Sequence, residues 1–304
     1  MTAGRSELRL RAPAKINLYL EVLGRRDDGF HELVTVLQAI DLCDEVTLRL
    51  RPRTRERDGG RSGGTAPEVR LELAGAAADV PGDATNLAVR AAAAVLSQAG
   101  AAADLALELR LEKRIPAGGG LGGGSSDAAA VLSGVNRLLG GPLDGGELAA
   151  LAAGLGSDVA FFLHNGTALC TGRGERVLSL ISPQPFAVTL LLPPFGTPTP
   201  RVYAALSAAP LPAARPRERA EALDALRRAF EDADVDELER LFRNDLEQPA
   251  RALEPRLGEL LDRTRLHLSG SGSTLFGFGR RDADLHSECS PTSICVAHSL
   301  PGND

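Results

Sequence analysis

The residues best suited to chemistry lie in a run of seven, 118–124, of which six are glycine. Glycine loses more backbone freedom on folding than any other residue, so such a run is typical of a place where backbone approaches another group closely. Leucines at every second position from 105 to 111 predict a strand before the run, and apolar residues at helical spacing from 128 to 139 predict a helix after it. A glycine loop between a strand and a helix N-terminus offers backbone N–H groups and a positive dipole end to an anion such as phosphate.

Three polar residues follow the glycines. Ser125 and Ser126 could donate hydroxyl hydrogen bonds to a phosphate or bind Mg²⁺, and serine at this place is equally typical of a helix N-cap. Asp127 is expected to cap the helix that begins near Ser126, because a negative charge suits the first helical turn.

Lysine is rare in this chain. Of 34 lysines and arginines only Lys15 and Lys113 are lysines. A compact ammonium is not equivalent to a planar guanidinium where one donor must fit beside a phosphate or an attacking oxygen. Both lysines lie beside motifs identified on other grounds, so we interpret them as functional residues rather than chance survivors.

Composition limits the function classes. The 304 residues are 43% hydrophobic and 24% charged, which is typical of a soluble globular chain of one large domain or two. A net charge of −6 without a basic stripe argues against a nucleic-acid partner. Four widely spaced cysteines without a CxxC pair favour a reducing compartment over a disulfide framework or zinc site. With no signal peptide or long apolar segment, we expect a cytoplasmic protein with no membrane partner and no obligate protein partner.

The expected elements position these motifs. A strand at 7–11 is followed, after Pro13, by a second strand with Lys15, Asn17 and Tyr19 on one polar face. Further strands are expected at 68–73, 177–180, 186–192 and 274–278, a helix from an N-cap at Thr85 to about residue 98, and mostly helices over 217–264. The arginine-rich stretch 49–61 is predicted to be a solvated hairpin or loop. A second small-residue loop spans 269–273.

Three other interpretations of the glycine run are weaker. A Walker A loop needs lysine directly before its Ser or Thr, and here Gly124 stands there. A dinucleotide fold needs an acidic residue at the end of a second strand, whereas Asp144 lies in a Gly/Pro turn. A flexible linker is disfavoured because a strand and a helix adjoin the run directly.

The segment 116–129 strongly resembles the phosphate loop of the GHMP kinases, the galactokinase, homoserine kinase and mevalonate kinase superfamily. Residues 12–18 match that family's N-terminal motif, and residues 268–274 resemble its C-terminal glycine loop. The resemblance implies an α+β fold of two domains, an N-terminal nucleotide-binding domain (1–185) and a smaller C-terminal domain (186–304), with the active site between them. It implies ATP as phosphoryl donor with Mg²⁺. The implied nucleotide-binding residues are Lys113, Pro116, Ala117, Gly118, Gly119, Gly120, Leu121, Gly122, Gly123, Gly124, Ser125 and Ser126.

Four further segments, 25–33, the long glycine loop, 156–163 and 199–203, resemble one subgroup of these kinases. That subgroup phosphorylates a small-molecule alcohol, the cytidine diphosphate ester of methylerythritol, in the non-mevalonate route to isoprenoids. Segments 51–66 and 287–304 match it less well. The resemblance argues against a kinase for another small alcohol, such as homoserine or mevalonate. A catalytically silent, ligand-sensing relative would be marked by loss of Lys15 or Asp158, and both are present.

The same resemblance assigns roles within the site. Asp158 on its own is typical of a helix cap, but the family places a catalytic aspartate at this motif, with Lys15 nearby to stabilise alkoxide charge. Phe30 and His31 are implied to bind the cytidine base, and Tyr203 could stack on it. Asn17 and Thr199 are the remaining candidate substrate-binding residues.

Overall fold

The computed structural model describes residues 6–53, 66–180, 185–207, 216–232, 234–279 and 293–301. The chain forms two compact units, each gathered from several segments. Unit one contains Met1–Pro13, Cys43–Ala117 and Gly123–Leu163, and unit two contains Ala14–Leu42, Gly118–Gly122 and His164–Asp304. These units follow compactness of the backbone and do not coincide with the predicted division after residue 185, which stays a prediction.

Two long strands, β1 (Glu7–Arg25) and β2 (His31–Pro52), contribute residues to both units. The two strands predicted on either side of Pro13 are therefore one strand. Lys15, Asn17 and Tyr19 are all at most 4% exposed, as are the apolar residues that alternate with them. The predicted polar face of this strand is thus an internal face, covered by other parts of the protein.

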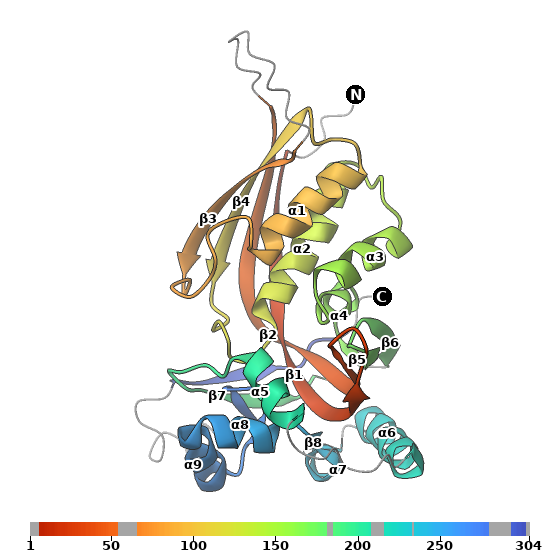
Figure 1. Ribbon diagram of the computed structural model, residues 1–304, viewed down its shortest axis with the longest axis vertical. Coiled ribbons are helices and arrows are strands. Elements are labelled where there is room, and N and C mark those ends of the chain that lie inside the picture. Colours follow the sequence, from red (N-terminus) through yellow and green to blue (C-terminus); the bar gives the residue numbers. More distant parts are fainter. Residues whose placement is uncertain are drawn as a thin grey trace. The chain divides into compact units, whose positions relative to one another are not determined.

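Unit one is a sheet with helices on one face (Figure 1). Its other strands are β3 (Glu68–Gly75), parallel to β4 (Leu105–Lys113), which runs antiparallel to residues 45–52 of β2. Its helices are α1 (Leu87–Gln98), α2 (Gly123–Leu138), α3 (Gly145–Leu155) and α4 (Val159–His164). The predicted cap of α1 at Thr85 is one residue too early, because the Asn86 side chain accepts the N–H of Ala88.

Helix α2 packs directly on the strands. A Cβ atom at Gly134 would lie 2.4 Å from Leu48 Cδ1 and 2.6 Å from Leu10 Cδ1, closer than real contacts allow. The leucines of β4 at 107, 109 and 111 are almost fully buried, as the alternation in the sequence predicts. The start of α2 is therefore fixed relative to the end of β4.

In its described residues, unit two contains five helices and strands of both sheets of the chain, one seven-stranded and one four-stranded. Residues 33–38 of β2 pair with β5 (Thr167–Gly172), which pairs with β6 (Arg176–Leu180), and β1 pairs with β8 (Arg243–Asn244). The four-stranded antiparallel sheet has the order β11 (Ser293–His298), β7 (Ala187–Leu192), β10 (Leu275–Phe278) and β9 (His267–Leu268). The helices are α5 (Thr199–Ser207), α6 (Pro216–Glu231), α7 (Val235–Leu241), α8 (Glu247–Leu253) and α9 (Pro255–Thr264), which confirms the predicted helical stretch.

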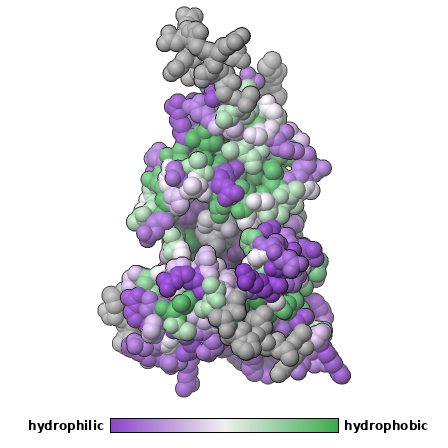
Figure 2. Space-filling model, viewed as in Figure 1, coloured by the Kyte–Doolittle hydropathy of each residue, from purple (hydrophilic) through white to green (hydrophobic). Residues whose placement is uncertain are grey.

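One apolar cluster of unit two supports the segments that carry site residues. It joins Leu20 and Val22 of β1 to Val202 of α5, to Ala250 of α8 and to leucines of α9, β9 and β10, and Tyr203 packs against it. Hydrophilic residues are mixed with hydrophobic ones on the outer face seen in Figure 2. None of the described helices is both long and apolar enough to span a membrane. The predicted loop at 49–61 lies mostly outside the described residues, as does much of the tail that begins at 287.

Helix α6 is attached to β1 through a buried carboxylate. Glu21 is 5% exposed and accepts hydrogen bonds from Arg219 at 2.5 and 3.1 Å and from the Tyr19 hydroxyl at 2.9 Å. Burial opposes ionisation of Glu21, but the hydrogen bonds from Arg219 and Tyr19 outweigh it and lower its pKa. The same burial and the neighbouring carboxylate raise the pKa of Tyr19 to about 12, so this contact stays intact across the physiological pH range.

Candidate active site

Three motifs that are far apart in the sequence meet within unit two. The backbone N–H of Lys15 donates to Leu121 O at 3.0 Å, which attaches the N-terminal motif to the glycine loop. The C-terminal loop attaches to the same glycines, through Ser269 Oγ to Gly120 O at 3.1 Å and Thr274 N–H to Gly119 O at 3.1 Å. The association of the three motifs, which their order in the sequence does not show, is therefore a property of the fold.

The glycine loop has a conformation that requires glycine. Gly118, Gly120 and Gly122 have φ angles of 69°, 75° and 72°, a region that side chains with a Cβ rarely adopt. At Gly120 the space is closed as well, since a Cβ would lie 2.1 Å from Ser269 O. The loop is shorter than the sequence indicates, because Gly123 and Gly124 already belong to α2.

The ammonium of Lys15 is fixed by neutral oxygens. Nζ donates to Asn17 Oδ1 at 2.6 Å and to Gly120 O at 2.7 Å, and the side chain is almost fully buried. Asn17 is fixed in turn by donating to Thr35 Oγ1 at 3.0 Å. A Cβ at Gly270 would lie 3.0 Å from Lys15 Nζ, so glycine there leaves room for the ammonium. These contacts hold the ammonium in a defined position beside the glycine loop.

Hydroxyl groups connect the C-terminal loop to the segment before α5. Thr197 Oγ1 donates to Ser271 O at 2.6 Å, and Thr199 Oγ1 lies 2.7 Å from Ser271 Oγ. Asn244, which sequence reasoning missed, donates to Leu268 O at 2.9 Å and Gly270 O at 2.8 Å. No sequence motif marks Asn244, since its partners come together only when β8 pairs with β1.

The predicted base-binding residues form two ring contacts in unit two. The rings of His31 and Tyr203 have centroids 4.9 Å apart with an interplanar angle of 31°. Phe30 is 50% exposed, and the Arg173 guanidinium lies 4.7 Å from its ring centroid. Burial, with the charge of Arg25, lowers the pKa of His31, so its imidazole is neutral at physiological pH. A neutral imidazole beside an aromatic ring suits a heterocyclic base.

The other predicted nucleotide residues belong to unit one. Lys113 ends β4, and its buried ammonium contacts Asp44 Oδ2 and, at 2.5 Å, Asp127 Oδ2. The expectation that Asp127 caps a helix is wrong. Because α2 begins at Gly123, Asp127 lies inside the helix, is 2% exposed and accepts from a lysine instead of a backbone N–H.

Two buried oxygens near the start of α2 have no hydrogen-bond partner in the described part of the chain, Ser126 Oγ and Asp127 Oδ1. A buried polar atom without a partner is costly and is typical of a place that a ligand completes. Together with the N-terminal amides of α2, the Ser126 hydroxyl fits a phosphate. The described His, Cys, Asp and Glu side chains form no group of three or more that could hold a metal ion.

The candidate base Asp158 also lies in unit one. It occupies a turn directly before α4 and is partly buried. Pro116 is partly buried and Ala117 is exposed, between Ile115 and the glycine loop. Unit one therefore holds Asp158, Lys113 and the first turn of α2, whereas unit two holds Lys15, Asn17 and the residues of the ring contacts.

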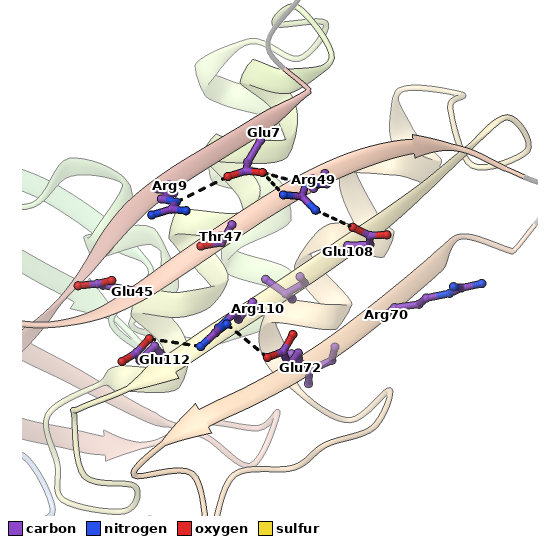
Figure 3. Close-up of a pocket in the computed structure, with 12 residues that line it drawn as sticks. Glu7, Arg9, Glu45, Thr47, Arg49, Arg70, Glu72, Glu108, Arg110 and Glu112 are labelled. Atoms are coloured by element: carbon purple, nitrogen blue, oxygen red, sulfur yellow. Dashed lines mark hydrogen bonds and ion pairs between the residues drawn. The ribbon is translucent and has the colours of Figure 1, made fainter.

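A groove on the sheet of unit one is a different kind of surface. Its volume of about 520 Å³ would admit a small molecule, but its lining is a lattice of alternating Glu and Arg side chains (Figure 3). Arg49 pairs with Glu7 and Glu108, and Arg110 pairs with Glu72 and Glu112. Such exposed pairs satisfy each other across the strands and contribute about 0–1 kcal/mol each. We interpret this groove as a solvated sheet face.

Comparison with known proteins identifies the family. Residues 86–166 match the family described as GHMP kinases N terminal domain. A 4-diphosphocytidyl-2-C-methyl-D-erythritol kinase of Heliobacterium modesticaldum is 41% identical over 295 residues, covering 92% of this chain and 89% of that protein. A protein of the same name from Nocardia farcinica is 39% identical, with 98% of this chain and 90% of that protein covered.

Comparison with solved structures supports the same family. The crystal structure of a 4-(cytidine 5'-diphospho)-2C-methyl-D-erythritol kinase superposes with a TM-score of 0.70 at 32% identity, covering 98% of this chain and 100% of that one. A homoserine kinase from Cytophaga hutchinsonii has the same TM-score at 20% identity, covering 99% of this chain and 97% of that one, and shows the shared fold alone. The α+β GHMP kinase fold predicted from the motifs is thereby confirmed. The protein is a phosphotransferase, and the chain belongs to the 4-diphosphocytidyl-2-C-methyl-D-erythritol kinase family of the GHMP kinases.

Proposed function

We propose that the protein transfers the γ-phosphoryl group of ATP to the 2-hydroxyl of 4-diphosphocytidyl-2-C-methyl-D-erythritol, giving the 2-phosphate and ADP, in the methylerythritol phosphate route to isoprenoid precursors. The observation that carries this proposal is the buried ammonium of Lys15, held by Asn17 and by Gly120 of the glycine loop. Phosphoryl transfer asks a protein mainly for positioning and charge stabilisation, and a fixed cation beside a phosphate-binding loop supplies both. The names of the similar proteins supply the identity of the alcohol.

The ATP phosphates are proposed to bind the segment 116–126, with Lys113 at its base. Support comes from the positive φ angles of Gly118, Gly120 and Gly122 and from the unpartnered, buried hydroxyl of Ser126. The loop conformation would let backbone N–H groups donate hydrogen bonds to phosphate oxygens, and the Ser126 hydroxyl could donate another. Bound Mg²⁺ would neutralise part of the phosphate charge.

Asp158 is the proposed general base. It takes the proton of the 2-hydroxyl while that oxygen bonds to the γ-phosphorus, and the bond to the β,γ-bridging oxygen breaks to release ADP. Lys15 stabilises the negative charge that develops on the attacking oxygen. The assignment of Asp158 rests on the family motif and on its partly buried place before α4.

The alcohol is proposed to bind through Asn17, Phe30, His31, Thr199 and Tyr203. The contact between the His31 and Tyr203 rings and the neutral state of the imidazole support a cytosine site there. Thr199 and Asn17 would hold hydroxyl or phosphate oxygens of the ester. We place this reaction in the cytoplasm, on a small molecule, without a nucleic-acid, membrane or obligate protein partner.

One assay tests the proposed function. ADP release from ATP and Mg²⁺ is measured with the cytidine diphosphate ester, methylerythritol phosphate, homoserine and mevalonate as acceptors. We expect turnover of the cytidine ester alone to be substantial. Faster turnover of homoserine or mevalonate would contradict the substrate, and binding of the ester without ADP release would favour a ligand-sensing protein.

A further inference from the structure

A buried cluster of charges lies at the base of the glycine loop. Asp44 of β2, Lys113 at the end of β4 and Asp127 of α2 are 0%, 4% and 2% exposed. Lys113 Nζ contacts one oxygen of each carboxylate. All three belong to unit one, and the sequence motifs predict no role for Asp44.

The cluster is poorly suited to a purely stabilising role. Two carboxylates share one ammonium away from water, and an ion pair so buried is often no more stable than apolar residues of similar volume. Burial, together with the charge of Asp44, outweighs the attraction of Lys113 and raises the pKa of Asp127 to about 7. What such a cluster does provide is one defined arrangement of the segments that it joins.

The segments that it joins flank the glycine loop, and we call them its two stems: residues 113–115 at the end of β4 and residues 123–127 at the start of α2. Asp44 Oδ1 accepts the backbone N–H of Arg114 at 2.5 Å and of Ile115 at 2.9 Å, which fixes the direction in which the chain leaves β4. Lys113 then links this stem to Asp127, in the second turn of α2. A Cβ at Gly123 would lie 3.0 Å from Ile115 Cγ2 and 3.5 Å from Asp44 Oδ2, so the two stems also pack closely.

A loop with four glycines among its five residues, 118–122, has many conformations when its ends are free. Fixing both ends removes much of that freedom before a ligand arrives, and preorganisation of this kind raises affinity without adding a contact. The ammonium of Lys113 already contacts two carboxylates. This arrangement suits a residue that links the two stems better than one that contacts phosphate directly.

We propose that Asp44 and Asp127 are positioning residues which, through Lys113, hold the two stems of the glycine loop and so set the affinity for ATP. This proposal rests on the proposed function, because it assumes that the glycine loop binds the nucleotide. It assigns to the cluster an effect on nucleotide binding and not on the phosphoryl-transfer step.

The test removes the contact between Lys113 and Asp127. In Asp127→Ala, Lys113 keeps Asp44 as its partner, so one balanced buried pair remains. We expect the Kd for ATP to rise about tenfold or more, with kcat at saturating ATP within about threefold of wild type. Asp127→Asn keeps an oxygen that can accept from Lys113, and its Kd should stay within about threefold of wild type. The matched control is Glu72→Ala, which removes an exposed carboxylate from the same unit and should leave both constants unchanged.

Amide hydrogen exchange of the ligand-free full chain provides a second readout. Exchange at residues 114–127 should increase in Asp127→Ala and not in Asp127→Asn or Glu72→Ala. Wild-type ATP affinity in a folded Asp127→Ala protein would overturn the proposal, as would equal losses of affinity in the Ala and Asn variants. Should Asp127→Ala not fold, Asp44→Asn tests the other stem, because the one oxygen of an amide cannot accept both from Lys113 and from the N–H groups of Arg114 and Ile115. An unchanged Kd in that variant overturns the proposal. Failure of the wild type to bind ATP would instead refute the proposed function itself.

Discussion

The two lysines of the chain are both buried, and the oxygens that their ammonium groups contact are of different kinds. Lys15, in unit two, donates to an amide oxygen and a backbone carbonyl, whereas Lys113, in unit one, contacts two carboxylates. Carboxylates offset the charge of the ammonium that they contact, whereas the amide oxygen and the carbonyl fix the position of Lys15 at the glycine loop. The same residue type can therefore act on a substrate in one place and hold the backbone in another. Arginine would fit neither environment well, because each holds a compact ammonium between closely spaced oxygens.

The largest effect is expected at Asp158, which lies in the same unit as Lys113 but is proposed to act with Lys15 on the reacting hydroxyl. Asp158→Asn keeps the size and capping ability of the side chain and removes its proton affinity. We expect kcat to fall roughly 10²–10⁴-fold. Loss of a cap alone would cost only about 1 kcal/mol of stability, so the melting temperature and ATP Kd should stay near wild type. Near-normal turnover would reduce Asp158 to a helix cap.

A smaller effect is expected when the neutral oxygens around Lys15 are moved. Gly120→Ala places a Cβ where Ser269 O lies 2.1 Å away, so the loop must shift and take the Gly120 carbonyl away from Lys15. We expect kcat to fall roughly 10- to 100-fold, the range typical of a misplaced catalytic group. Gly24→Ala is the control, because no atom lies within 4 Å of its added Cβ. Equal activity of the two variants would mean that the position of this carbonyl is unimportant.

The smallest effect concerns stability and arises from the carboxylates around Lys113. The pKa of Asp127 is raised from 3.8 to about 7, so between these pH values the folded chain binds a proton that the unfolded chain has lost. The stability contribution of this proton is complete below pH 3.8 and is lost as the pH rises through about 7. The melting temperature of Asp127→Asn should therefore fall less than that of wild type between pH 5 and about 8. Parallel melting curves for the two proteins across this range would contradict the assigned pKa.

Periodicity and motif spacing predicted much of this molecule, because they act locally. Alternation placed Lys15 and Asn17 on one face of β1, and their 2.6 Å hydrogen bond confirms it. Burial of that face was not predictable from the strand alone. The start of α2 was predicted too late because six glycines resemble a longer loop, and the expected cap at Asp127 was wrong for the same reason. Asp44 and Asn244 have no local signal, since their partners come from other elements that meet only in the fold.

The central claim, that the two lysines have separate tasks, is tested most directly by measuring ATP Kd and kcat in Lys15→Met and Lys113→Met side by side. Melting temperatures are recorded for both, because the second change leaves two buried carboxylates without their cation and destabilises the fold. The assays are run well below the lower melting temperature. In Lys15→Met we predict a fall in kcat of about 10²-fold or more, with ATP Kd within about threefold of wild type. In Lys113→Met we predict that ATP Kd rises about tenfold or more while kcat at saturating ATP falls less than about tenfold. The same pattern of losses in both variants would contradict the account.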